Sequence, residues 1–104
     1  MLQRDSNLDK LALSFAYRVA QDRYLSHYTK DGITPEQRAK SLGINFDYLG
    51  ENLALASNPL SAHQAMMNSV DHKANIEMPV FKKIGIAAIS ISPSEKIFVE
   101  EFSN

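Results

Sequence analysis

The chain has 104 residues, of which 44% are apolar and 22% are charged, and we expect a single globular domain over residues 1–104. Eleven basic and twelve acidic side chains leave a net charge of -1, and no basic cluster is larger than Lys82-Lys83, which excludes a surface for nucleic acid or anionic membranes. No apolar run is long enough to span a bilayer and no cysteine is present, which excludes a transmembrane segment, a disulfide framework and a thiol nucleophile.

The first predicted element is a long amphipathic helix from Ser6 to about His27. Its apolar residues recur every three or four positions and form one stripe, made of Leu8, Leu11, Ala12, Phe15 and Val19. Ser6 is the expected N-cap, and Asp9 lies in the first turn, where the helix dipole favours a carboxylate. His27 is expected in the last turn, beside the apolar stripe. The residues before this helix lack the apolar segment of a signal peptide.

Two shorter helices are predicted in the middle of the chain. The segment Thr34-Pro35-Glu36-Gln37 is typical of a helix start, with threonine as the cap, proline at the first position and glutamine at the third. Gly43 is the expected C-terminal stop of this helix. A third helix should begin near Asn58-Pro59 and be followed by a short helical turn that carries His72.

The remaining segments are predicted to be strands. Leu49 to Ala56 is an extended segment, and its alternation places Glu51 on the same face as Leu53. Lys83 to Ser92 and Ile97 to Phe102 are apolar and β-branched, and the turn between them makes a hairpin. Both faces of this hairpin carry apolar residues, which indicates a sheet covered on both sides. We therefore predict an α/β (α+β) fold, a three-layer α/β/α sandwich with a small antiparallel sheet between helices.

Three polar motifs stand out among these elements. They are Ser26-His27-Tyr28, Gly50-Glu51-Asn52 and the segment from Ser69 to Ile76, which carries His72 and Asn75. In this order, with Arg38 in the helix between the first two, they resemble the CAP superfamily of cysteine-rich secretory, antigen 5 and pathogenesis-related proteins. The short bacterial SCP-like members are the most similar. The resemblance implies one CAP domain, in which His27, Glu51 and His72 converge on a polar cleft.

The sequence departs from the family pattern at three places. Met66 stands where the family has tryptophan, and Glu100 stands where it has glutamine. Larger members also have a second glutamate on the helix before the second histidine, and here that segment carries only Asp71, at a different offset. The candidate metal-ligand set is therefore reduced to three residues: His27, Glu51 and His72.

Three interpretations of these residues stay open. Two neutral imidazoles and one carboxylate could bind zinc or another divalent cation and leave one position for water. The same residues could act as general acid and base, because a carboxylate raises the pKa of a neighbouring histidine. They could also form a structural hydrogen-bonded cluster, since an inward-facing Glu51 needs polar partners.

Two other polar residues have simpler interpretations. Ser69 precedes His72 by three residues and is expected to be an N-cap rather than a nucleophile, because no Gly-x-Ser-x-Gly motif is present. His63 has no partner motif and is expected to face solvent on its helix.

The resemblance also implies a function and a location. We expect a secreted or cell-envelope protein, extracellular or at the cell surface, that binds an unknown ligand or protein as a monomer. Weak divalent-metal binding at His27, Glu51 and His72 is compatible with this role, and we do not expect an efficient enzyme. Two alternatives are a metal-assisted hydrolase of peptides or esters and, by family analogy, a lipid- or sterol-binding protein.

Overall fold

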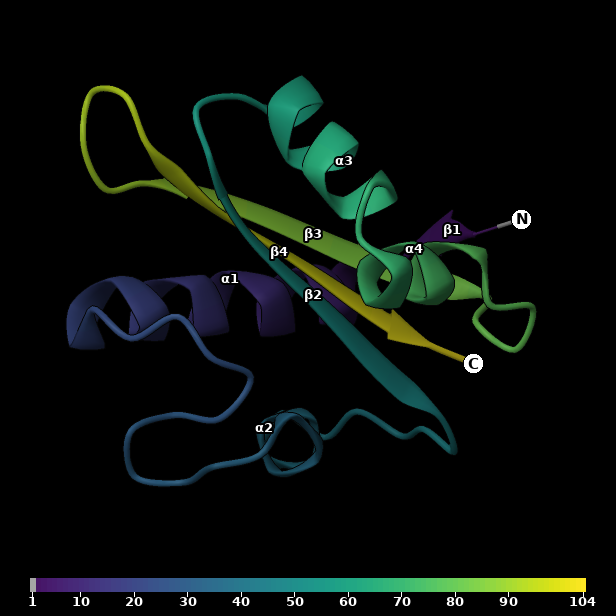
Figure 1. The fold of residues 1–104 in the computed structure, drawn as a ribbon. Coiled ribbons are helices and arrows are strands. Elements are labelled where there is room, and N and C mark those ends of the chain that lie inside the picture. Colours follow the sequence, from purple (N-terminus) through teal and green to yellow (C-terminus); the bar gives the residue numbers. More distant parts are fainter. Residues whose placement is uncertain (1) are drawn as a thin grey trace.

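The computed structural model describes residues 2–104 as one mixed sheet with helices on both faces (Figure 1). In chain order the elements are β1 (Gln3–Arg4), α1 (Ser6–Asp22), α2 (Pro35–Ser41), β2 (Leu49–Ala56), α3 (Pro59–Met67), α4 (Val70–Glu77), β3 (Lys83–Ser90) and β4 (Lys96–Ser103). The strand order is β1-β3-β4-β2. The three long strands are antiparallel, and the short β1 adds a parallel pair at the edge.

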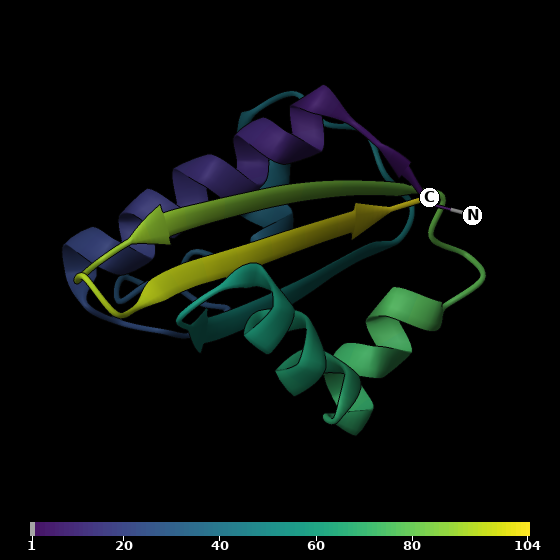
Figure 2. The same ribbon diagram turned by 90° about the horizontal axis from the view of Figure 1, so that it is seen from above.

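The helices form two layers, one on each face of the sheet. Viewed from above, α1 lies over one face and α3 and α4 lie over the other (Figure 2). The helix α2 belongs to the α1 layer, since its buried Ala39 packs with Leu8 and Leu11 of α1. The predicted three-layer α/β/α sandwich is therefore confirmed. Within residues 2–104, no helix is long and apolar enough to cross a membrane.

The helix α1 ends earlier than predicted. It begins at Ser6, but the N-cap is Asp5, whose side chain accepts a hydrogen bond from the Leu8 amide at 2.9 Å. It ends at Asp22 because Arg23 adopts a left-handed conformation with φ of 51° and donates its N–H to the Val19 carbonyl. The apolar stripe stops at Val19, so a longer helix would have no further core residue to bury. His27 consequently lies in the loop after α1 and not in the last helical turn.

The helix α2 and its boundaries match the sequence prediction. The Thr34 hydroxyl accepts from the Gln37 amide at 3.1 Å, and the Gln37 side chain accepts from the Thr34 amide at 2.9 Å. This reciprocal capping box fixes the start of the helix. Gly43 follows the helix with a positive φ of 74°, which a residue with a side chain adopts at a cost.

The core on the α1 side forms where α1 crosses β3 and β4. The apolar stripe of α1 is buried as predicted, and its residues Ala12, Phe15 and Val19 pack against the sheet residues Leu53, Ala87, Ile97 and Val99. Gly85 of β3 lies directly under the backbone of Leu8, and a Cβ atom at Gly85 would collide with the Leu8 carbonyl group. This glycine lets the first turns of α1 lie close against the sheet.

The opposite face is covered over β2 and β4, but less over β3. Met66 and Ala62 of α3 pack on Phe98, and the rings of Phe81 and Phe102 stack with centroids 5.6 Å apart. Both faces of β4 are therefore buried, as predicted. Ile86 of β3 is 37% exposed, so the prediction that both faces of the whole hairpin are covered is wrong for this residue. The helices α3 and α4 pack against β2 and leave the outer face of β3 open.

Candidate functional site

The Gly50-Glu51-Asn52 motif lies in β2, and its three residues point alternately to the two faces of the sheet. Glu51 faces the layer of α1 and α2, and its side chain is only 2% exposed. Asn52 faces the other layer and is fully buried. Gly50 shares the face of Asn52, where a Cβ atom would lie 2.7 Å from the Phe81 ring. Gly50 therefore makes room for Phe81, while the side chains of Glu51 and Asn52 are buried under the helical layers on opposite faces of the sheet.

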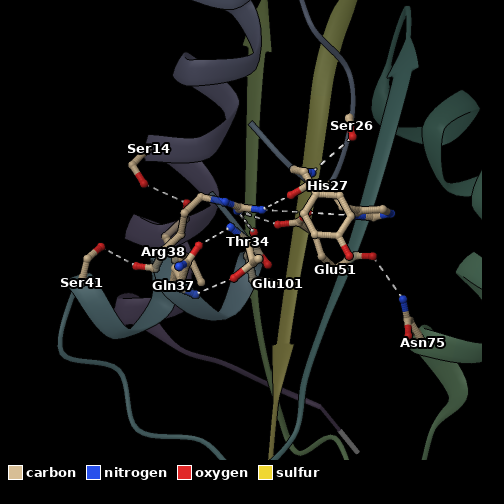
Figure 3. A network of polar contacts seen from close by, with 12 residues as sticks. Ser14, Ser26, His27, Thr34, Gln37, Arg38, Ser41, Glu51, Asn75 and Glu101 are labelled. Carbon is tan, nitrogen blue, oxygen red and sulfur yellow. Dashed lines mark hydrogen bonds and ion pairs between the residues drawn. The ribbon is translucent and has the colours of Figure 1, made fainter. Parts of the chain in front are cut away.

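Arg38 of α2 holds both oxygens of the Glu51 carboxylate (Figure 3). Its Nη1 donates to Glu51 Oε2 at 2.8 Å, and its Nη2 donates to Oε1 at 3.3 Å. The same Nη2 donates to the backbone carbonyl of His27 at 2.6 Å, so one guanidinium fixes both the carboxylate and the loop. The guanidinium lies over the Phe15 ring, with its carbon 3.4 Å from the centroid, in a cation–π contact.

His27, in the loop after α1, is the second side chain that binds the Glu51 carboxylate. Its Nδ1 lies 2.8 Å from Glu51 Oε1, and because an ionised carboxylate only accepts, Nδ1 is the donor. The hydrogen bond to Glu51 raises the pKa of His27 above its ordinary value, although partial burial and Arg38 oppose this. The imidazole is 48% exposed and so connects a buried carboxylate with the protein surface.

The surroundings of Glu51 favour its ionised form. Burial alone would raise the pKa of Glu51, but the hydrogen bonds with His27 and Arg38, the charge of Arg38 and the neighbouring Glu101 carboxyl outweigh burial and lower it. The buried site thus contains a carboxylate that accepts hydrogen bonds from Arg38 of α2 and from His27 of the loop after α1. Such an arrangement fixes the ends of the elements that it joins.

His72 is attached to the site by its backbone. Its carbonyl accepts from Asn52 Nδ2 at 3.1 Å, on the α4 side of the sheet. Asn75, one turn further along α4, donates to the Glu51 carbonyl at 3.1 Å and to Asn52 Oδ1 at 2.9 Å. The structure therefore joins His27 and Glu51 directly through side chains, and it places His72 beside the other face of the same strand.

The described residues do not form a ready-made metal centre. Within residues 2–104, no group of three or more His, Cys, Asp or Glu side chains is arranged to hold a metal ion. The chemistry of the donor set explains this, because the Arg38 guanidinium already occupies the carboxylate where a cation would bind. Zinc binding by His27, Glu51 and His72 stays a prediction and requires Glu51 to exchange Arg38 for the metal.

Two residues of this cluster are absent from the predicted ligand set. Arg38 was expected in α2, but no local pattern indicates that it reaches Glu51 on a strand. Glu101 of β4 is fully buried and lies opposite Glu51 in the register of the sheet. A signal for Glu101 does exist in the sequence, since strand alternation places it on the same inward face as Ile97 and Val99.

Residues 1–102 match the family described as CAP, the cysteine-rich secretory protein family. The chain belongs to this family. The resemblance carried by the three motifs is thereby confirmed, and the CAP domain accounts for nearly all of the sequence.

Two relatives share this CAP sequence at moderate identity. YkwD of Bacillus subtilis (strain 168) is 31% identical over 102 residues, which cover 97% of this chain and 38% of YkwD. A protein of Borreliella burgdorferi is 30% identical over 101 residues, which cover 97% of this chain and 64% of the relative. The chain therefore spans between about a third and two thirds of the length of these relatives.

Solved structures of CAP and SCP proteins share the fold. An extracellular SCP-domain protein of Bacillus anthracis aligns with a TM-score of 0.90 at 24% identity. This alignment covers 100% of this chain and 34% of the Bacillus anthracis chain. An outer surface protein of Borrelia burgdorferi has a TM-score of 0.90 at 28% identity, and the alignment covers 99% of this chain and 77% of that protein's chain. A venom allergen-like protein of Schistosoma mansoni has a TM-score of 0.73 at 16% identity, and the alignment covers 98% of this chain and 66% of that protein's chain.

Proposed function

We propose that this CAP domain is an extracellular or cell-surface binding module, in which the Glu51 cluster holds His27 at the surface for recognition. The observation that carries the proposal is that both oxygens of Glu51 are already bound by Arg38 and His27. A carboxylate held in this way neither binds a metal ion nor takes a proton from water without losing these partners. The location follows the extracellular and outer-surface proteins that share the fold.

The exposed part of His27 is the group that would meet a ligand. Its Nδ1 is used by Glu51, so its other ring nitrogen, Nε2, is free to contact a partner. With a raised pKa, the ring carries a proton on both nitrogens over a wider pH range than an ordinary histidine. An imidazolium at the surface donates to carbonyl or carboxylate oxygens, so the proposed ligand presents such an acceptor.

One observation favours hydrolysis as a second candidate function. A histidine whose Nδ1 donates to a buried carboxylate is oriented in the way that general bases are oriented in hydrolases. Hydrolysis of a peptide or ester would use Nε2 of His27 to take a proton from water. This route does not need a metal ion, and it competes with the binding role for the same nitrogen.

Calorimetric titration of the domain with zinc at pH 7 separates these functions when combined with an ester and peptide hydrolysis assay. For a binding module we expect a zinc dissociation constant weaker than about 1 μM and no turnover that depends on His27 or His72. His27→Ala and His72→Ala are the test variants, and His63→Ala is the matched control on an exposed helix position. Nanomolar zinc affinity lost in both test variants, together with turnover that requires zinc, would replace the binding module by a metal-dependent hydrolase. Turnover that needs no zinc and is lost in His27→Ala alone would replace it by a metal-free hydrolase.

A further inference from the structure

Glu101 is a buried carboxyl group that the proposed function does not use. It lies in the middle strand β4, opposite Glu51 of β2 on one side and Gly85 of β3 on the other. Because Gly85 has no side chain and α1 lies directly on it, water is kept away from Glu101 on that side. The residue is 0% exposed and points to the same layer as Glu51 (Figure 3).

The hydrogen bonds around Glu101 are incomplete if it carries a negative charge. Within residues 2–104, neither carboxyl oxygen of Glu101 has a hydrogen-bond donor. The nearest cationic group is Arg38 Nη1, 3.7 Å from Glu101 Oε2, which is beyond hydrogen-bonding distance. That nitrogen is already bound to Glu51 at 2.8 Å. A fully buried carboxylate with no donor is strongly unfavourable, whereas a protonated carboxyl supplies its own donor.

We propose that Glu101 is a neutral carboxylic acid at pH 7 that donates its proton to the Glu51 carboxylate, and that it is a positioning residue which keeps Glu51 ionised and directed towards His27. One cation, Arg38, then balances one anion, Glu51, in the buried site. The proposal rests on the Glu51 site of the proposed function, but it holds whether that site binds a partner or catalyses hydrolysis.

The charges around Glu101 agree with this assignment. Burial raises the pKa of Glu101 well above its ordinary value, and the nearby Glu51 carboxylate with its negative charge raises it further. Glu36 of α2 acts in the same direction, and Arg38 opposes it. His27 approaches from the loop on the far side of Glu51. Three charged or titratable groups, Glu36, Arg38 and His27, thus surround the pair, and the two carboxyls share one proton between them.

The test compares Glu101→Gln with the wild-type protein by NMR titration of the His27 ring and of the glutamate side-chain carboxyl carbons from about pH 4 to about pH 9. Glutamine has the shape and the donor of a neutral acid, so we expect the pKa of His27 to stay unchanged in this variant. The wild-type Glu101 carbon should keep its protonated shift at pH 7. Glu100→Gln, on the opposite face of the same strand, is the matched control.

Two outcomes overturn the proposal. If Glu101 is ionised in the fold, its removal takes a negative charge away from the site, and the pKa of His27 falls in Glu101→Gln but not in Glu100→Gln. If the wild-type Glu101 carbon titrates near its ordinary pKa of 4.5, Glu101 is also not the proton donor. The second measurement needs no variant and decides the matter even if Glu101→Gln does not fold. Neither result depends on zinc affinity or turnover, so the binding-module proposal stands or falls separately.

Discussion

Arg38 makes most of the contacts in the site, since a single side chain contacts groups from three other elements. Its guanidinium binds the Glu51 carboxylate of β2 and the His27 carbonyl of the loop, and it lies on the Phe15 ring of α1. A planar group with several donors is suited to this, because it binds a carboxylate with two nitrogens and still offers a face to an aromatic ring. A lysine at the same place would keep the charge and lose the geometry.

The titrating residues of the site predict how stability depends on pH. The pKa of His27 is raised by Glu51, so its contribution is fully present below 6.5 and is lost as pH rises through the folded value. The pKa of Glu101 is also raised, so its contribution is fully present below 4.5 and is lost as pH rises through its folded value. The pKa of Glu51 is lowered, so its contribution is present above 4.5 and is lost as pH falls through the folded value. We expect maximal stability near the ordinary carboxyl value of 4.5, with a decline towards both lower and higher pH.

Urea unfolding at a series of pH values measures this dependence. In His27→Ala the fall in unfolding free energy above neutral pH should become smaller, with only the Glu101 part remaining. In Glu51→Gln the loss on acidification should shrink as well. A profile with its maximum in the alkaline range would contradict the assigned pKa directions.

At the scale of elements, α4 is attached mainly by polar side chains. None of its residues is fully buried, and its first turn has Ser69 at the N-cap position without a side-chain capping bond. Asn75 and the carbonyl of His72 bind Glu51 and Asn52 of β2 instead. The spacing from His72 to Asn75 in the sequence motif is therefore the spacing of one helical turn placed against a strand.

Replacing Asn75 should loosen α4 specifically. Asn75→Ala removes two donors to buried acceptors, and we expect a loss of about 1–3 kcal/mol in unfolding free energy. Hydrogen exchange should accelerate in α4 and remain unchanged in the β3–β4 hairpin. Asn68→Ala, at an exposed position after α3, is the control and should have little effect. Equal exchange rates in α4 of both variants would show that other contacts hold this helix.

The elements differ in how far they could be predicted from the sequence. The capping box of Thr34 and Gln37 and the alternation in β2 are local signals. The first identifies the start of α2, and the second identifies β2 and its inward face. The end of α1 is not local, because the helical pattern continues towards His27 and only the extent of the core stops the helix at Asp22. The contacts of Arg38 and Glu101 depend on which strands become neighbours, and no short motif records that.

At the scale of the whole molecule, the two helical layers cover the sheet unequally. Phe102 of β4 is completely buried, and its ring stacks on Phe81. Ile86 of β3, in contrast, is 37% exposed on the side that α3 and α4 leave open. The core is therefore continuous through β4 and thins towards β3. The short strand β1 and the end of β4 lie at the same end of this sheet, on either side of the start of β3.

The unequal covering predicts unequal effects of truncation in the same hairpin. Phe102→Ala leaves a cavity in the core and should cost about 3–5 kcal/mol of unfolding free energy. Ile86→Ala removes a side chain that is partly in water and should cost no more than about 1 kcal/mol. Urea denaturation of both variants measures the difference. Similar losses in the two variants would mean that the outer face of β3 is covered after all.

The position of β2 gives the Asn75 contact a further consequence. β2 is the last strand of the sheet, and a strand at an edge carries unpaired carbonyl and amide groups that another chain can use to extend the sheet. Asn75 binds the carbonyl of Glu51, the third residue of this strand, so a side chain already occupies one of its backbone acceptors. The contact that holds α4 in place thus also removes one of the acceptors with which another chain could extend the sheet.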